Sequence, residues 1–256
     1  MSIPFDDRGL TLGDGLFETL LADDGKLVAF DAHAARLERS CLMLGLPAPD
    51  RVGLRAAAAE ALADFGLETT RSAVRLTWTA GSGGRGLERP AVLAPRLFAT
   101  AAAAPKPTTP ARLVTVDVRR NDTSIAARLK TLSYLDNVLA RREALARGAD
   151  EALMLNTRGE IAGAAAANIF WLEDDRLFTP ALDCGVLAGI ARGEVMATAA
   201  AAGLTVEEVR ARPEALAGAQ GVFLTSSLIG LRPVAALDGR AQQPTQVTTL
   251  LMRGRR

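Results

Sequence analysis

The chain has 256 residues, a hydrophobic share of 49%, a charged share of 23% and a formal net charge of +1. This balance is ordinary for a globular protein and disfavours nucleic-acid binding, while two cysteines and one histidine disfavour a zinc cluster, a bound metal or a disulfide framework. No apolar run has the length of a membrane span and the first residues do not resemble a signal peptide, so we expect a cytoplasmic protein without membrane or nucleic-acid partners.

The first hundred residues predict a mixture of strands and helices. Asp31 is expected to cap a helix that stops at Gly45, because acidic residues favour helix starts and glycine favours helix ends. Alternating apolar residues predict strands, and a glycine-rich loop separates two of them. The expected ranges are a hairpin over 15–30, helices over 31–45 and about 50–65, a strand at 74–78, the loop 81–86 and a strand over 93–103.

The second half is also mixed. Pro105, Pro107 and Pro110 mark a linker, after which strands and helices follow without regular βαβ alternation. We therefore predict an α+β fold of two domains: residues 1–104, a linker region 105–120, and residues 121–256. The elements expected after the linker are strands over 113–118, 152–155, 168–172 and 222–225, helices over about 133–147 and 189–202, and turns at 156–159 and 174–175. A short basic tail, formed by Arg253, Arg255 and Arg256, is expected to be solvated.

Lysine is rare in this chain, with three lysines against 27 arginines. Lys26 falls in a predicted turn and Lys106 in the linker, whereas Lys130 lies between apolar neighbours just before a predicted helix. A lysine amine can lose its proton and attack a carbonyl, which arginine cannot do. The residues alone leave two interpretations of Lys130 open: a Schiff-base lysine, or a solvated lysine at a helix start.

Three further groups could carry chemistry. His33 is either catalytic or a structural residue of a helix's first turn, and Arg36 would present a planar donor fork one turn later. The small residues of Gly189–Arg192 open a predicted helix whose free amides could bind an anion. The hydroxyls of residues 225–227 could join a phosphate site or cap a turn. Nucleotide-binding glycine motifs are not found.

In order and spacing, these segments resemble the class IV aminotransferases, which are fold-type-IV pyridoxal phosphate enzymes. The resemblance covers nearly the whole chain. The segments that carry it are Asp7-Arg8-Gly9, Gly13-Asp14-Gly15-Leu16-Phe17-Glu18-Thr19, His33-Ala34-Ala35-Arg36-Leu37, Lys130-Thr131-Leu132-Ser133-Tyr134-Leu135, Ala166-Ala167-Asn168-Ile169-Phe170, Thr179-Pro180, Gly185-Val186-Leu187-Ala188-Gly189-Ile190-Ala191-Arg192 and Thr225-Ser226-Ser227.

The resemblance implies a two-domain α+β fold with pyridoxal 5′-phosphate at the domain interface and a homodimer whose partner helps to close each site. It makes Lys130, in the C-terminal domain, the Schiff-base residue. It gives cofactor contacts to the Arg36 side chain, the Ile190 and Ala191 amides and Ser227. Further cofactor positions are Gly163, Asn168 and Ser226, and the substrate-side positions are Phe17, Tyr134 and Arg85.

One position departs from the family pattern. A glutamate that pairs with the pyridine nitrogen stands five residues before the asparagine in relatives, and here that residue is Gly163. Glu160, the nearest carboxylate, is expected to point elsewhere. Without a carboxylate the ring would be a weaker electron sink, which slows the proton transfers of transamination.

The resemblance therefore leaves three functions open. The leading one is a transaminase that moves an amino group between an amino acid or amine and a 2-oxo acid. The alternative is a 4-amino-4-deoxychorismate lyase, which releases pyruvate and 4-aminobenzoate, because the loop 81–86 and Ile169-Phe170-Trp171 resemble that lyase. The third is a cofactor-binding relative with little activity. Phe17, where D-amino acid transaminases have tyrosine, disfavours that specificity, and Arg85 is the candidate for a substrate carboxylate.

Overall fold

The computed structural model describes residues 3–242 and divides the chain into two compact units. Unit 1 contains the residues up to Pro105 together with Leu129–Ser133, and unit 2 contains Lys106–Arg128 and the residues from Tyr134 onward. The basic tail at 253–256 lies outside the described residues. Between residues 3 and 242, none of the helices is long and apolar enough to cross a membrane.

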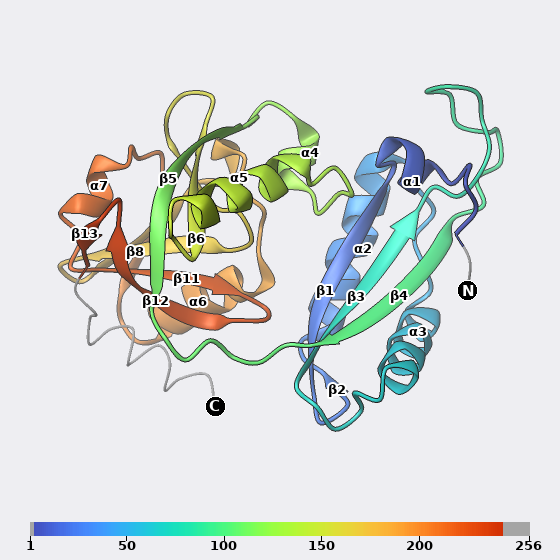
Figure 1. Cartoon of the computed structure of the whole chain (residues 1–256), viewed down its shortest axis with the longest axis horizontal. Helices are drawn as coiled ribbons and strands as arrows, with labels where there is room; N and C mark the ends of the chain where they lie inside the picture. The colour runs from blue at the N-terminus through green and yellow to red at the C-terminus, as the bar shows by residue number, and fades with distance from the viewer. Residues whose placement is uncertain (1–2, 243–256) are drawn as a thin grey trace. The chain divides into compact units, whose positions relative to one another are not determined.

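Unit 1 is a four-stranded antiparallel sheet with helices packed against it (Figure 1). The strand order is β2-β1-β3-β4. Its elements are α1 (Arg8–Leu12), β1 (Gly15–Asp23), β2 (Lys26–Leu27), α2 (Phe30–Leu44), α3 (Arg51–Asp64), β3 (Ser72–Thr79) and β4 (Arg96–Ala103).

The core of unit 1 lies between one face of this sheet and the helices α2 and α3. Leu20 of β1, Leu76 of β3, Leu37 of α2 and Leu54 of α3 are all fully or almost fully buried in one apolar cluster. Since side chains alternate across a strand, the residues next to Leu20 on β1 and next to Leu76 on β3 project to the other face of the sheet. That second face carries Phe17 and Arg75, which matter for the site below.

Unit 2 contains a nine-stranded mixed sheet in its described part. The strand order is β10-β9-β8-β11-β12-β5-β6-β7, with β13 beside β12. The strands are β5 (Ala111–Arg120), β6 (Glu151–Asn156), β7 (Ile161–Ala164), β8 (Asn168–Glu173), β9 (Arg176–Pro180), β10 (Thr205–Val209), β11 (Gly221–Ser226), β12 (Gly230–Leu237) and β13 (Arg240–Ala241).

Helices cover separate parts of this sheet. The helix α5 (Leu135–Ala146) packs on β5 and β6, and α6 (Ile190–Ala201) packs against β10 and β11. Short helical turns complete the unit at α4 (Ile125–Arg128), η1 (Leu182–Cys184) and α7 (Glu214–Ala217). The strands β5 and β6 are parallel, while β6 and β7 are antiparallel with an irregularity in their register.

The structure corrects two details of the sequence prediction. The helix α2 is capped by Ala29 in a left-handed conformation, not by Asp31, which lies inside the helix. The strand β4 begins at Arg96, three residues later than expected. The segment 129–133, which the sequence assigns to the C-terminal domain, groups with unit 1, and the domain boundaries themselves stay a prediction.

Candidate active site

Lys130 lies in a short segment that runs along the edge of β1. Its carbonyl accepts a hydrogen bond from the Phe17 amide at 2.9 Å, and the Leu132 amide donates to the Gly15 carbonyl at 3.0 Å. The preceding Leu129 is buried in the core of unit 1. The backbone of Lys130 is therefore fixed by β1, although the two segments are far apart in sequence.

The Lys130 amine lies over an aromatic ring that it shares with a second cation. Its Nζ atom is 4.2 Å from the centre of the Phe17 ring, and the Arg75 guanidinium carbon is 3.6 Å from the same centre. Both are cation–π contacts. Phe17 is almost completely buried, so this ring forms part of the floor beneath the amine.

Burial changes the acidity of this lysine. Desolvation disfavours the charged ammonium and lowers the pKa of Lys130 to about 8, with the nearby Glu18 carboxylate opposing the change and the Arg36 and Arg75 cations adding to it. A solvated lysine has a pKa near 10.5. A larger fraction of Lys130 amines is therefore neutral near neutral pH than for a solvated lysine, and a neutral amine can act as a nucleophile or base.

A buried carboxylate organises the charges next to this lysine. Glu18 is 2% exposed, and its two oxygens contact Arg36 Nε at 2.8 Å, Arg36 Nη2 at 2.6 Å and His33 Nδ1 at 2.7 Å. Burial alone would raise the pKa of Glu18, but the hydrogen bonds from Arg36 and His33 bring the pKa below its ordinary value. The carboxylate is thus ionised and bidentately bound at neutral pH.

These contacts settle where His33 and Arg36 lie. His33 is buried, and its Nδ1 faces a carboxylate inside unit 1. Arg36 directs Nε and Nη2 at Glu18, so this side of its donor fork is occupied. The phosphate role that the resemblance gives to Arg36 stays a prediction and would have to use the other edge of the guanidinium.

Unit 2 contains the predicted anion-binding helix start. Gly189 caps α6 without a side-chain hydrogen bond, which leaves the amides of Ile190 and Ala191 without intrahelical acceptors. A Cβ atom at position 189 would lie 2.1 Å from Asn168 Oδ1, so a side chain there would displace the Asn168 amide. Asn168 in turn donates through Nδ2 to the Leu187 carbonyl at 3.0 Å, so it holds the loop that leads into α6.

The predicted hydroxyls lie where β11 ends. Ser226 is the last residue of β11, and its Oγ accepts a hydrogen bond from the Ile229 amide at 3.3 Å. Ser227 follows in the turn. Thr225, just before them, is fully buried, and its Oγ1 has no hydrogen-bond partner among the described residues. A buried hydroxyl without a partner is unusual, and a bound water or ligand would supply the missing hydrogen bond.

Gly163 adopts a backbone conformation that explains why no other residue is easily placed there. Its φ angle is +101°, a region that L-residues rarely adopt. A Cβ atom would also lie 3.3 Å from the carbonyl oxygen of Ala167. The position of the family's carboxylate is therefore occupied here by a glycine whose backbone conformation disfavours a side chain.

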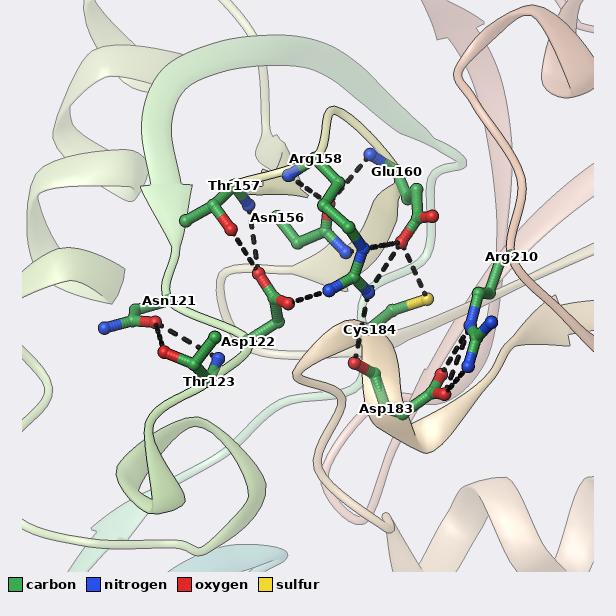
Figure 2. Close-up of polar contacts among 10 residues, drawn as sticks. All are labelled: Asn121, Asp122, Thr123, Asn156, Thr157, Arg158, Glu160, Asp183, Cys184 and Arg210. Atoms are coloured by element: carbon green, nitrogen blue, oxygen red, sulfur yellow. Dashed lines mark hydrogen bonds and ion pairs between the residues drawn. The ribbon is translucent and has the colours of Figure 1, made fainter.

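Glu160 does not replace that carboxylate, because it belongs to a network at the surface of unit 2 (Figure 2). Its Oε2 accepts hydrogen bonds from Asn156 Nδ2 at 2.7 Å and Arg158 Nη2 at 2.8 Å, and Cys184 Sγ lies 3.6 Å away. Arg158 also pairs with Asp122. The charges of Glu160 and Arg158 are thus paired within this network, which the sequence analysis did not predict.

The substrate-side candidates lie in different environments. Phe17 is beneath Lys130, as described above. Tyr134 is partly buried and lies directly before α5. Arg85 is exposed on the glycine-rich loop of unit 1. That loop is held by Arg8, which donates to the Leu87 carbonyl at 3.0 Å and to the Glu88 carbonyl at 2.9 Å.

Sequence reasoning missed Glu18 and Arg75 as functional candidates. Glu18 stands inside a motif that carried the family resemblance, but nothing local to it predicts two partners on α2. Arg75 stands between the buried Val74 and Leu76 in the alternation of β3, which places it on the sheet face opposite the core. That alternation is a usable signal, whereas its proximity to Lys130 depends on a long-range contact.

Comparison with known proteins identifies the family. A sequence model described as amino-transferase class IV matches residues 15–237. The chain therefore belongs to the class IV aminotransferase family and is an enzyme of that family, which confirms the resemblance. The expected fold class is also confirmed, because solved structures of this family superimpose on the whole chain.

Three relatives show the range of activities in the family. A putative branched-chain-amino-acid aminotransferase of Methanocaldococcus jannaschii is 32% identical over 94% of this chain and 84% of its own length. The crystal structure of 4-amino-4-deoxychorismate lyase from Pseudomonas aeruginosa is 32% identical, with a TM-score of 0.90, and the match covers 99% of this chain and 94% of the lyase. A hypothetical aminotransferase from Mycobacterium tuberculosis in its PLP-bound form is 26% identical, with a TM-score of 0.87 over 99% and 92% of the two chains.

Proposed function

We propose that this protein is a pyridoxal phosphate-dependent transaminase that moves an amino group between an amino acid or amine and a 2-oxo acid. The observation that carries the proposal is Lys130, a buried lysine with a pKa of about 8 over the ring of Phe17. A lysine in this state serves both as the Schiff-base residue and as a proton acceptor near neutral pH.

The residues of the structure fit this cofactor. The open amides of Ile190 and Ala191 and the unpartnered hydroxyl of Thr225 are suited to a phosphate, and Lys130 is suited to an aldehyde. Ser226 and Ser227 add hydroxyls, and Arg36 adds a positive charge. When bound, pyridoxal phosphate supplies the electron sink that acidifies the Cα proton of an amino acid.

The chain's own residues then have distinct tasks. Lys130 Nζ, when neutral, would accept the proton from the Cα of a bound amino acid and hold it for transfer back. Glu18 keeps Arg36 and His33 in place and limits how far the pKa of Lys130 falls. Arg75, which shares the Phe17 ring with Lys130, and Arg85 are the cations available for a substrate carboxylate. The homodimer and the cytoplasmic location belong to the same proposal.

A panel of amino donors tests the function. The purified protein is loaded with pyridoxal phosphate and mixed with L- and D-amino acids, branched-chain amino acids and simple amines, each with and without 2-oxoglutarate. We expect a lysine-dependent absorption band that disappears with a productive donor and returns with the oxo acid. A band that no donor changes would leave only cofactor binding, the third function considered from the sequence.

The lyase is a second candidate, and Gly163 favours it. The backbone at Gly163 disfavours the carboxylate that strengthens transamination, and elimination of pyruvate asks less of the ring. Aminodeoxychorismate therefore belongs in the same panel. Formation of 4-aminobenzoate and pyruvate in equal amounts, without a change in any amino donor, would assign the lyase activity and exclude the transaminase.

A further inference from the structure

Arg120 is a largely buried cation without an oxygen partner for its Nε. It is the last residue of β5, and its Nε atom is fully buried with no hydrogen-bond partner among the described residues. Its Nη2 donates to the sulfur of Met154 at 3.3 Å, which is a weak acceptor. Burying a guanidinium with so little compensation is unfavourable, so this side chain is prepared for a ligand.

The register of the sheet places this guanidinium level with Gly163. The strand β6 lies between β5 and β7, with Leu153 opposite Ala164 and Leu155 opposite Ile161. Met154, between those two leucines, is therefore opposite the irregular part of β7 that contains Gly163. Since Arg120 Nη2 contacts the Met154 sulfur, the guanidinium extends from β5 to β6, the strand beside this part of β7.

The side chains on this face agree with that position. Met154 and Ala165 belong to the same buried cluster, so both project to the side of the sheet covered by α5. Ile161 and Ala164 both lie in the cluster on the opposite face, so the alternation of β7 is broken between them, and position 163, next to Ala164, is assigned to the α5 side. A carboxylate at this position would lie on the Arg120 side of the sheet, and its absence leaves the guanidinium without that partner.

The charged and titratable groups around Arg120 do not replace it. Tyr134 and Asp136, which precede and begin α5, interact with the guanidinium electrostatically. No ion pair within 4 Å joins Arg120 to either of them or to another carboxylate of residues 3–242. Burial lowers the pKa of Arg120 from its ordinary value, while Tyr134 and Asp136 raise it.

We propose that Arg120 donates a hydrogen bond to the pyridine nitrogen of the bound cofactor, at the place where relatives present a carboxylate. This inference rests on the proposed function, because it requires pyridoxal phosphate in the site. A guanidinium donor needs an acceptor lone pair, so the ring nitrogen is held unprotonated, and the positive charge disfavours its protonation further.

The consequence is a weaker electron sink than in relatives with the glutamate. Steps that accumulate negative charge on the ring are slowed, whereas a reaction that expels a leaving group soon after Cα deprotonation is slowed less. Arg120 is thus a positioning residue for the ring and sets the balance between the transaminase and lyase reactions.

The test is the nitrogen NMR spectrum of the loaded protein. Wild-type protein is prepared with pyridoxal phosphate labelled with ¹⁵N in the ring, and the ¹⁵N chemical shift is measured at pH 7.5. We expect the shift of an unprotonated, hydrogen-bonded pyridine. A shift typical of the protonated ring would overturn the proposal, and this measurement needs no variant.

Two variants locate the effect. Arg120→Gln should weaken cofactor binding in equilibrium dialysis by about tenfold, which is the effect of losing one charge-assisted hydrogen bond, and should move the ¹⁵N shift. Arg119→Gln, at the exposed neighbouring position, is the matched control and should change neither. Equal affinities and shifts in all three proteins would contradict the assignment of Arg120.

Failure of this inference is distinct from failure of the proposed function. If cofactor binds through Lys130 but its nitrogen is protonated, only the role of Arg120 is wrong. If wild-type protein forms no lysine-dependent absorption band, the proposed function and this inference both fail.

Discussion

Two arginines, the buried Arg36 of unit 1 and the largely buried Arg120 of unit 2, are stabilised in different ways. In unit 1, Arg36 makes two hydrogen bonds to a single carboxylate, Glu18, which is itself ionised and buried. In unit 2, Arg120 contacts a thioether sulfur, and its Nε has no partner among residues 3–242. Position 163, where relatives carry a carboxylate, is a glycine with a left-handed backbone.

The difference distinguishes a buried charge that is already paired within the protein from one that lacks an acceptor until a ligand binds. A buried ion pair such as Glu18–Arg36 is satisfied before any ligand arrives, so its removal should act mainly on stability. A buried cation without an acceptor is unfavourable until a ligand binds, so its removal should act mainly on ligand affinity. Lys130 is another largely buried cation, and desolvation lowers its pKa to about 8, so its amine loses a proton more easily than that of a solvated lysine.

The largest effect is expected for the reactive cation. Lys130→Ala removes the only group proposed to bond the cofactor and move the proton, so turnover should fall by about a hundredfold or more. The absorption band of lysine-bound cofactor should also disappear. The exposed Lys106 provides the control, since Lys106→Ala should leave both measurements unchanged. Substantial activity in Lys130→Ala would remove the basis of the proposed function.

The stability contribution of Arg36 is tested by removing the charge of its partner, Glu18. Glu18→Gln leaves Arg36 and His33 without their anion, and breaking such a buried pair costs about 3–5 kcal/mol of unfolding free energy. Chemical denaturation of the cofactor-free protein at pH 7 measures this loss. The matched variant is Glu38→Gln, on the helix α2 that carries Arg36 and His33, because its pair with Arg51 is exposed and should contribute little.

The same pair gives a pH dependence. Because the folded-state pKa of Glu18 lies below its ordinary value of 4.5, the pair stabilises the fold above that pH and loses its contribution as the pH falls below it. Glu18→Gln should therefore be less sensitive to acid than wild type between pH 5 and the point of unfolding. An unchanged acid profile would show that Glu18 is not the ionised partner of Arg36.

Local patterns were sufficient for much of the fold. The helix α3 follows its amphipathic pattern, and Asp50 caps it by accepting from the Val52 and Gly53 amides. The end of α2 at Gly45 was predictable because that residue adopts a positive φ angle that glycine favours. The sequence did not indicate Ala29 as the cap of α2, since no side-chain signal accompanies a left-handed alanine.

The site was predictable where a residue was unusual and not where a contact was long-range. Lys130 stood out because lysine is rare in this chain, and Gly163 stood out against the family pattern. Arg120 was one arginine among many, and its lack of an oxygen acceptor at Nε depends on the packing of β5, β6 and α5. Charge pairs between distant segments, such as Glu18 with Arg36, have no local sequence signature.

The empty position opposite Arg120 can be tested with alanine. Gly163→Ala should destabilise the protein by about 1–3 kcal/mol, because a non-glycine residue at a φ of +101° is strained. Gly193→Ala is the control, since Gly193 lies within α6 with open space around its Cβ position and should gain about 0.5–1 kcal/mol. Equal effects of the two variants would show that the backbone of β7 relaxes freely.

The smallest net effect is expected when the missing carboxylate is restored. Gly163→Glu carries the same backbone strain as Gly163→Ala, but its carboxylate would face Arg120 and form a partly buried pair. A charge-assisted hydrogen bond is worth about 1.5–3 kcal/mol, so the pair should offset most of the strain and leave the free energy of unfolding within about 1 kcal/mol of wild type.

The pair is isolated by a double-mutant cycle that combines Gly163→Glu with Arg120→Gln. In the cycle, Gly163→Glu should be clearly more destabilising when Arg120 is absent. The carboxylate should also draw the guanidinium away from the cofactor and allow the ring nitrogen to be protonated, so the ¹⁵N shift should move and amino-donor half-reactions should become faster. Additive effects of the two substitutions would mean that position 163 and Arg120 do not face each other.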